Sequence, residues 1–177
     1  MDFRIRRGEE RDARPIGQVQ VESWKSTYAD IVPDDFLASM DTDSRAERWR
    51  ELIAAGDMHI FVAEDETGVF GFVSGGKLRE PIDGYDTELF AIYLLQKNQG
   101  KGVGRRLFGE LAATLRSEGR IGMALWVLRQ NPAVGFYQRM GGVEIGHKTI
   151  QIGGAALEEV AFGFNLSLDP TQPVAVQ

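Results

Sequence analysis

The chain has 177 residues, a net charge of −6 and no cysteine. Its length fits one domain with its own core, and 43% hydrophobic with 26% charged residues excludes a largely disordered chain. The lack of cysteine excludes disulfides, thiolate zinc sites and a cysteine acyl-enzyme. The acidic balance argues against a broad nucleic-acid surface, although a local basic site could still bind an anionic small molecule.

No segment reads as a leader or a membrane helix, because the arginine-containing start lacks an apolar run and no long uncharged apolar stretch follows. We therefore expect a cytoplasmic protein without a membrane partner. Residues 1–168 should form one domain, since no linker or repeat divides them. Residues 169–177, which contain two prolines, should form a loose tail.

Periodicity and turn residues predict the elements in chain order. They are a strand at 3–7, an N-terminal helix, helices at 33–40 and 44–55, strands at 59–64, 69–78 and 87–95, a helix at 102–118, a strand at 122–127, a helix at 132–140, and strands at 143–152 and 157–164. The N-terminal helix carries Val21, Trp24 and Tyr28 on one stripe. Asp43 or Ser44 is expected to cap the helix at 44–55.

The connections between these elements predict a fold class. Turn-type residues at 65–68 and 153–154 indicate two antiparallel hairpins. A helix separates the strands at 87–95 and 122–127, so these two should be parallel. The sequence therefore predicts an α/β protein with a mixed (α+β) sheet of about seven strands flanked by helices.

Three glycines alternate where the strand at 87–95 leads into the next helix: Gly100, Gly102 and Gly104. Without Cβ atoms there, backbone N–H groups can close on a ligand at the positive end of the helix dipole. Four basic side chains surround these glycines, namely Lys97, Lys101, Arg105 and Arg106. The pattern predicts a cradle for an anion such as pyrophosphate, and a flexible, solvated basic turn is the alternative.

Two familiar phosphate motifs do not fit this loop. A P-loop needs Ser or Thr after its Gly-Lys pair, whereas Gly102 follows Lys101. A dinucleotide-binding fingerprint needs a glycine where Arg105 stands.

Residues 99–105 instead resemble the Gln/Arg-x-x-Gly-x-Gly/Ala loop of the GNAT superfamily of acetyl-CoA-dependent N-acetyltransferases. A second segment typical of that family lies downstream, in Leu125-Trp126-Val127, Asn131-Pro132-Ala133, Phe136-Tyr137 and Met140-Gly141. The order of elements agrees as well, so the resemblance covers residues 3–166. The chain departs from the family at Gly142, where members commonly have phenylalanine, which affects a packing contact rather than the glycine loop.

The resemblance implies that the strands at 87–95 and 122–127 splay apart and that the pantetheine arm of acetyl-CoA lies between them. It implies a cofactor site made of Tyr93, Leu94, Leu95, Gln99, Gly100, Lys101, Gly102, Val103, Gly104, Arg105, Asn131, Ala133 and Tyr137. The expected contacts of Tyr93 and Leu94 are main-chain ones, so a simple role in the strand core is the alternative for both.

The resemblance also implies two catalytic residues. Tyr137 occupies the position of the family tyrosine that faces the CoA sulfur, so it is the candidate proton donor to the leaving thiolate, and the alternative is an ordinary core tyrosine. Glu88 stands eleven residues before Gln99, as does the catalytic glutamate of the histone-modifying members. It is the candidate general base, directly or through water, unless a water chain does this work or Glu88 is only a solvated edge charge.

Trp24 and Tyr28 are expected to line the acceptor side, where aromatic walls bind amine-bearing groups; for Trp24, packing onto the sheet is the alternative. No metal is expected, because neither His59 nor His147 has other ligands at metal-binding spacing.

The resemblance predicts an enzyme that transfers the acetyl group of acetyl-CoA directly to a primary amine of a small molecule, peptide or protein, in a ternary complex. Homodimers are frequent in the family, so a homodimer is expected. The sequence does not indicate which of the possible amines is the acceptor. The alternatives are a CoA-binding sensor or interaction domain without turnover, and a relative that uses a non-amine acceptor or a longer acyl group.

Overall fold

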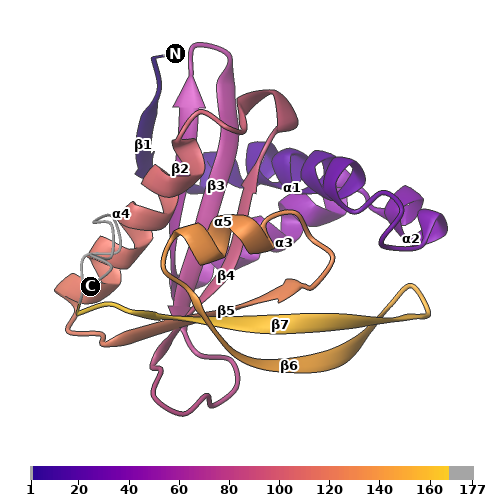
Figure 1. The fold of residues 1–177 in the computed structure, drawn as a ribbon. Coiled ribbons are helices and arrows are strands. Elements are labelled where there is room, and N and C mark those ends of the chain that lie inside the picture. Colours follow the sequence, from indigo (N-terminus) through magenta and orange to yellow (C-terminus); the bar gives the residue numbers. More distant parts are fainter. Residues whose placement is uncertain (1, 168–177) are drawn as a thin grey trace.

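The computed structural model describes residues 2–167, so the predicted tail lies outside the described residues. Its seven strands form one mixed sheet in the order β1-β2-β3-β4-β5-β7-β6 (Figure 1). The strands are β1 (Arg4–Arg7), β2 (Met58–Asp65), β3 (Gly68–Lys77), β4 (Thr87–Leu94), β5 (Gly122–Leu128), β6 (Val143–Ile152) and β7 (Ala155–Asn165). The predicted mixed sheet of seven strands is therefore confirmed.

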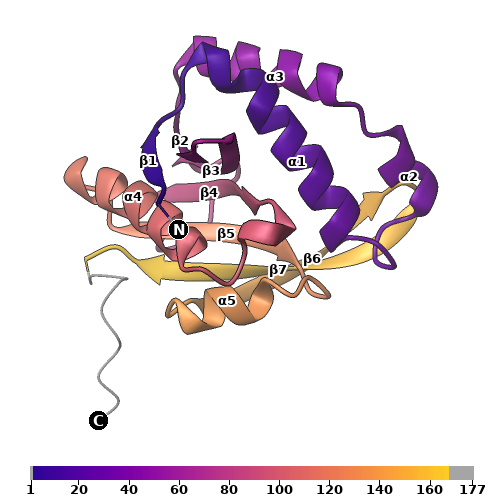
Figure 2. The same ribbon diagram turned by 90° about the horizontal axis from the view of Figure 1, so that it is seen from above.

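The helices are α1 (Ala13–Thr27), α2 (Asp34–Ser39), α3 (Thr42–Ala55), α4 (Val103–Ser117) and α5 (Val134–Arg139), with short 3-10 turns η1 (Glu10–Asp12) and η2 (Gln96–Asn98). α1 and α3 cover one face of the sheet, and α4 and α5 cover the other (Figure 2). None of the helices in residues 2–167 combines the length and the apolar character that crossing a membrane requires.

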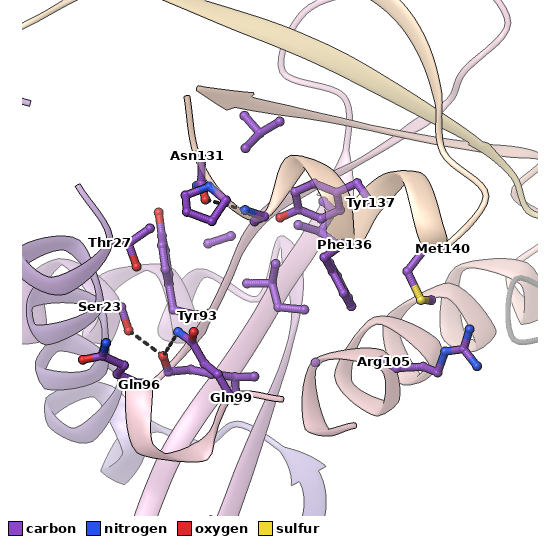
Figure 3. Close-up of a pocket in the computed structure, with 18 of the residues that line it drawn as sticks. Ser23, Thr27, Tyr93, Gln96, Gln99, Arg105, Asn131, Phe136, Tyr137 and Met140 are labelled. Atoms are coloured by element: carbon purple, nitrogen blue, oxygen red, sulfur yellow. Dashed lines mark hydrogen bonds between the residues drawn. The ribbon is translucent and has the colours of Figure 1, made fainter. Parts of the chain in front are cut away.

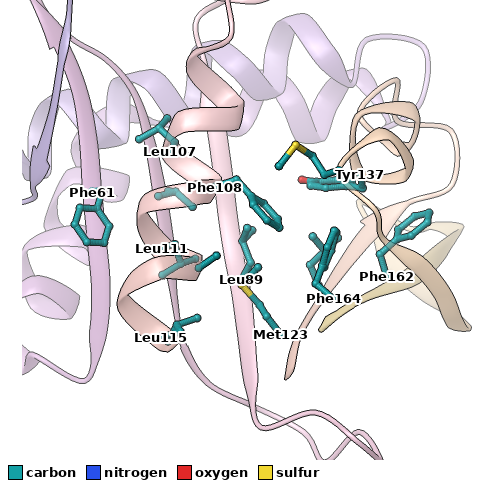
Figure 4. Close-up of a cluster of buried hydrophobic side chains, with 14 of the residues drawn as sticks. Phe61, Leu89, Leu107, Phe108, Leu111, Leu115, Met123, Tyr137, Phe162 and Phe164 are labelled. Atoms are coloured by element: carbon teal, nitrogen blue, oxygen red, sulfur yellow. The ribbon is translucent and has the colours of Figure 1, made fainter. Parts of the chain in front are cut away.

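Helix α4 forms the centre of the larger core, as its apolar periodicity predicts. Its buried stripe consists of Val103, Leu107, Phe108, Leu111, Ala112 and Leu115. These side chains pack on apolar residues of β4, β5 and β7, including Leu89, Met123 and Phe164 (Figure 4). The burial of this stripe fixes the start of α4, and with it the glycine loop, against the sheet.

Both predicted hairpins are confirmed. The first joins β2 and β3, and its turn is held by Asp65, whose Oδ1 accepts the Thr67 backbone N–H at 2.8 Å. The second joins β6 and β7 through Gly153 and Gly154. β7 pairs antiparallel with both β5 and β6, so β7 lies inside the sheet and β6 forms its edge.

The predicted cap of α3 is wrong. The cap is Asp41, whose extended backbone lets its Oδ2 accept the Ser44 N–H at 2.7 Å and the Ser44 hydroxyl at 2.8 Å. Asp43 lies inside the first turn, and Ser44 is the partner of the cap rather than the cap itself. α5 is also shorter than predicted, because residues 131–133 form a turn before it.

Strands β4 and β5 are parallel but pair only at Thr87 with Met123 and at Glu88 with Ala124. Beyond these pairs the strands separate, as the family resemblance implies. On its other side, β4 pairs with β3 through a register shift that leaves Phe90 as an extra residue opposite Ser74 and Gly75. The sheet therefore opens at its middle, directly before the glycine loop.

Candidate active site

A pocket of about 710 Å³ occupies the opening between β4 and β5 (Figure 3). β4 forms its floor from Leu89 to Leu94, and α1, the glycine loop and α5 form its walls. Beyond Glu88 the edge of β4 that faces β5 has no strand partner. Such an edge offers backbone N–H and C=O groups to an extended ligand.

One backbone group on this strand is already engaged. The Leu94 carbonyl accepts from the Ser23 hydroxyl at 3.2 Å and from the Gln99 side-chain amide at 3.1 Å (Figure 3). These bonds join α1, β4 and the glycine loop at one point. The entrance to the pocket is therefore held by contacts between three separate segments.

The glycine loop brings the start of α4 to the pocket. Gly102 caps α4 with a left-handed backbone at φ +80° and makes no side-chain capping bond. The first amides of a helix have no partner inside the helix, so here they are available to an anion, and the helix dipole favours negative charge at this end. Arg105, one turn into α4, also lines the pocket.

Asn131 ties α5 to α1 across the pocket. Its Oδ1 accepts the Ala133 backbone N–H at 2.8 Å, and its Nδ2 donates to the Tyr28 hydroxyl at 2.9 Å. The first bond fixes the turn that leads into α5, and the second is buried. Asn131 and Ala133 both line the pocket, so the downstream segment predicted from the sequence lies beside the glycine loop in space.

Tyr137 lies on α5 and is only 6% exposed. Its ring contacts Phe136 and Phe162, with centroids 5.3 Å and 6.2 Å away, and its hydroxyl points toward the pocket (Figure 3). Burial, with a smaller contribution from nearby Tyr28, raises the pKa of this phenol. The hydroxyl has no hydrogen bond to any residue between 2 and 167, so it is free to act on a ligand.

Most residues predicted to bind the cofactor line this pocket, namely Tyr93, Leu94, Gln99, Gly100, Gly102, Gly104, Arg105, Asn131, Ala133 and Tyr137. Leu95, Lys101 and Val103 do not. Leu95 packs into the core, Val103 is 1% exposed in the α4 stripe, and the Lys101 ammonium donates to the Lys97 carbonyl at 2.6 Å. The alternating pattern alone could not show which loop side chains turn away from the pocket.

The departure at Gly142 has a packing explanation. A Cβ on this residue would lie 2.7 Å from the Phe164 ring and 2.9 Å from the Tyr137 carbonyl oxygen. Phe164, from β7, packs edge-on against Phe108 of α4 at 4.9 Å. An aromatic ring from β7 therefore occupies the space beside the Gly142 backbone.

A second pocket of about 340 Å³ adjoins the first and shares Tyr28, Phe90, Tyr93, Trp126 and Val127 with it. Trp24 forms part of its wall. The Trp24 ring lies 4.6 Å from that of Tyr28, and its Nε1 donates to the Tyr93 hydroxyl at 2.8 Å. Trp24 thus lines the second pocket and Tyr28 lines both, and the two are also packing residues.

Glu88 lines the second pocket and is held by Arg79 from the loop between β3 and β4. The carboxylate accepts the Arg79 backbone N–H at 3.2 Å, the Nε at 3.1 Å and a further bond from the guanidinium. The side chain is only 3% exposed. Glu88 is therefore a buried, paired carboxylate and not the solvated edge charge that the sequence left as its alternative.

Three further charged residues line the second pocket and were not predicted: Glu80, Lys148 and Glu159. Lys148 comes from β6 and lies over the Trp126 ring, 4.1 Å from its centroid. The sequence carried no signal for this set, because it depends on the insertion of β7 between β5 and β6. Within residues 2–167, no group of three or more acidic or histidine side chains is placed to hold a metal ion.

Comparison with known proteins gives the class. The chain matches the acetyltransferase (GNAT) family model over residues 22–142. It is similar to the uncharacterized N-acetyltransferase YuaI of Bacillus subtilis (strain 168), with 38% identity over 161 residues, 90% of this chain and 91% of that protein. The chain therefore belongs to the GNAT acetyltransferase family, and it is an acyltransferase.

Solved structures share the fold. PaiA N-acetyltransferase from Thermoplasma acidophilum, in complex with coenzyme A, has a TM-score of 0.69 and 23% identity, covering 90% of this chain and 98% of that one. YncA from Salmonella typhimurium, with its cofactor acetyl-CoA, has a TM-score of 0.69 and 24% identity, and the match covers 98% of this chain and 99% of that one. At these identities the likeness concerns the fold.

Proposed function

We propose that the chain transfers the acetyl group of acetyl-CoA directly to a primary amine of a small molecule or peptide, within a ternary complex. The observation that carries this proposal is the junction of two adjoining pockets with different chemistry. One joins a free strand edge to the free amides at the start of α4, and the other is lined by aromatic rings and by three carboxylates with two basic side chains. Such a pair suits an anionic donor on one side and a cationic acceptor on the other.

The donor pocket suits the phosphates and the extended arm of acetyl-CoA. The free amides at the start of α4 and the Arg105 side chain would hold pyrophosphate, and the unpaired edge of β4 would pair with the arm. Gly100 and Gly102 have open space where a Cβ would stand, so nothing fills the approach to these amides. Family membership and the CoA-bound structures that share the fold support this assignment.

The transfer itself needs an uncharged amine, a held thioester and stabilisation of the leaving sulfur. The nitrogen lone pair attacks the carbonyl carbon, the C–S bond breaks, and the acceptor nitrogen loses a proton. The Tyr137 hydroxyl would donate to the departing sulfur. Because its pKa is raised, this phenol stays protonated in the working range, which favours a hydrogen bond to the sulfur over complete proton transfer.

Assembly, location and the range of acyl groups stay predictions. A homodimer is expected from the family, and light scattering of the purified protein tests it. Cytoplasmic location is tested by fractionation of the source cells. The use of acetyl rather than a longer acyl group is tested by comparing acetyl-CoA with longer acyl-CoA donors.

The proposal is tested by following CoA thiol release over polyamines, amino acids, aminoglycosides and peptide N-termini. We expect one acceptor class to give amine-dependent release together with an acetylated product in mass spectrometry. Calorimetry with acetyl-CoA is the matched control. Binding without release for any amine would contradict transfer and favour the sensor alternative.

A further inference from the structure

Glu159 on β7 is a half-buried carboxylate. It stands between Leu128 of β5 and Lys148 of β6 in the strand register, and it lines the second pocket. Its carboxylate forms no hydrogen bond or ion pair with any residue in the described range 2–167. Buried carboxylates are usually paired, so an unpaired one beside a pocket indicates a ligand-binding role.

Glu88 differs from Glu159 in its environment. Three hydrogen bonds from Arg79 occupy its oxygens. A carboxylate held in this way has little hydrogen-bonding capacity left for a substrate ammonium. The Glu88–Arg79 pair is therefore better suited to shaping the pocket than to removing a proton.

Charged and titratable groups reach Glu159 from each neighbouring segment: Lys148 from β6, Arg79 and Glu80 from the loop between β3 and β4, Glu88 from β4, and Tyr28 beside α1. Burial is the largest influence and raises the pKa of Glu159. Lys148 and Arg79 oppose this rise, while Glu88 and Glu80 add to it.

Glu159 also lies close to the junction of the two pockets. Its charge influences Tyr28, which lines both pockets and in turn influences the phenol of Tyr137. Glu159 lines the second pocket, whereas Tyr137, the candidate proton donor to the thiolate, lines the first. The two groups would then act on the reaction from different pockets.

We propose that Glu159 binds the ammonium group of the acceptor and accepts its proton before attack. One N–H bond of the ammonium breaks, the proton forms an O–H bond on the carboxylate, and the freed electron pair on nitrogen attacks the thioester carbon. The C–S bond then breaks with its electron pair on the CoA sulfur, which leaves as the thiolate, and the nitrogen of the new amide releases its second proton to solvent. The carboxylic acid then returns its proton to solvent through the pocket. This inference rests on the proposed acetyl transfer to an amine.

Steady-state kinetics of Glu159→Gln, Glu88→Gln and Glu158→Gln test the assignment, with acetyl-CoA and the panel amine that has the highest kcat/KM. Glu158 is the matched control, because it lies on the same strand but pairs with Arg129 at 2.7 Å outside the pocket. We expect Glu159→Gln to lower kcat/KM for the amine about 10²-fold near neutral pH, within the range of general base catalysis. Glu158→Gln should match wild type.

The pH profile separates catalysis from structure. In wild type, kcat/KM for the amine should fall at acid pH with a midpoint above the ordinary glutamate pKa of 4.5, and this fall should be absent in Glu159→Gln. The rate of Glu159→Gln should recover at higher pH, because more of the amine is then uncharged. The affinity of Glu159→Gln for acetyl-CoA should stay within about twofold of the wild-type affinity. The unfolding midpoint at pH 7 should not fall, because the substitution removes a desolvated charge.

A wild-type pH profile in Glu159→Gln would overturn the assignment. A lowered kcat/KM in Glu88→Gln alone would return the role of base to Glu88. A lowered unfolding midpoint with an unchanged profile would likewise show a structural role for Glu159. If wild type binds acetyl-CoA but acetylates no amine, the proposed function fails and the inference fails with it.

Discussion

At the scale of single residues, the environment of Tyr137 sets what its hydroxyl can do. The ring is buried against Phe136 and Phe162, and the phenol pKa is raised mainly by that burial. A thiolate resembles cysteine, with a pKa near 8.5, so it can leave unprotonated at modest cost. The help from Tyr137 should therefore be moderate.

We predict that Tyr137→Phe lowers kcat and kcat/KM together by about 10²-fold to 10³-fold, while acetyl-CoA affinity changes little. The substitution keeps the ring contacts and removes only a hydroxyl that has no partner within residues 2–167. Initial rates and calorimetry measure the two quantities. Retained kcat with a lower melting temperature would identify Tyr137 as an ordinary buried tyrosine, with water as the proton source.

At the scale of elements, Arg6 joins the four-residue strand β1 to its neighbours. Its guanidinium donates to Glu64 on β2 at 2.7 and 3.0 Å and to Asp12 before α1 at 2.6 and 2.9 Å. Hydrogen bonding from Arg6 is the main reason that the pKa of Glu64 is lowered to about 2. This network replaces the packing that so short a strand cannot provide.

We predict that Glu64→Gln lowers the free energy of unfolding at pH 7 by about 2 kcal/mol, as expected for hydrogen bonds to a charged group. The Glu64 pKa is lower in the folded state, so its contribution is present above its ordinary value of 4.5 and is lost as the pH falls toward 2. Urea unfolding of both proteins from pH 7 to pH 2.5 measures this.

Glu144→Gln is the control, because the Glu144–Arg129 pair is 43% exposed on both sides and should contribute less than about 1 kcal/mol. A difference between wild type and Glu64→Gln that stays constant with pH would contradict the ionic origin of the effect.

The elements that could be predicted from the sequence are those with a local signal. The α4 stripe has a strict 3.6-residue period, and the glycine loop and both hairpin turns carry their own residue types. The cap at Asp41 was missed because the four consecutive residues 41–44 are all of types that can cap a helix. The pairing of Glu88 with Arg79 was missed because it depends on the conformation of the loop between β3 and β4. The place of Glu159 was missed because it depends on strand order, which local periodicity does not encode.

At the scale of the whole molecule, the opening between β4 and β5 is a space that a ligand would fill. The strands pair only at Glu88 and the residue before it, and the pocket of about 710 Å³ separates α1 from α5. A ligand there would contact both faces of the sheet. Binding should therefore stabilise the complete fold.

We predict that acetyl-CoA at about 100 times its Kd raises the free energy of unfolding by about 2.7 kcal/mol. For a chain of this size, that corresponds to a rise in melting temperature of roughly 5 to 10 °C. Differential scanning calorimetry measures the shift, and ATP at the same concentration serves as the control. An equal shift with ATP would contradict a site built for the whole of acetyl-CoA.

The start of α4 as the phosphate site is tested most directly by calorimetric titration of acetyl-CoA into wild type, Gly102→Val and Gly119→Val. Gly102 and Gly119 lie at opposite ends of α4, have φ of +80° and +79°, and have open space where a Cβ would stand. Both substitutions carry the same backbone strain, on the order of 1–2 kcal/mol. Only the one at Gly102 places a side chain beside the free amides of α4. We predict micromolar or tighter binding by wild type and Gly119→Val and no measurable binding by folded Gly102→Val, whereas wild-type affinity in Gly102→Val would contradict the assignment.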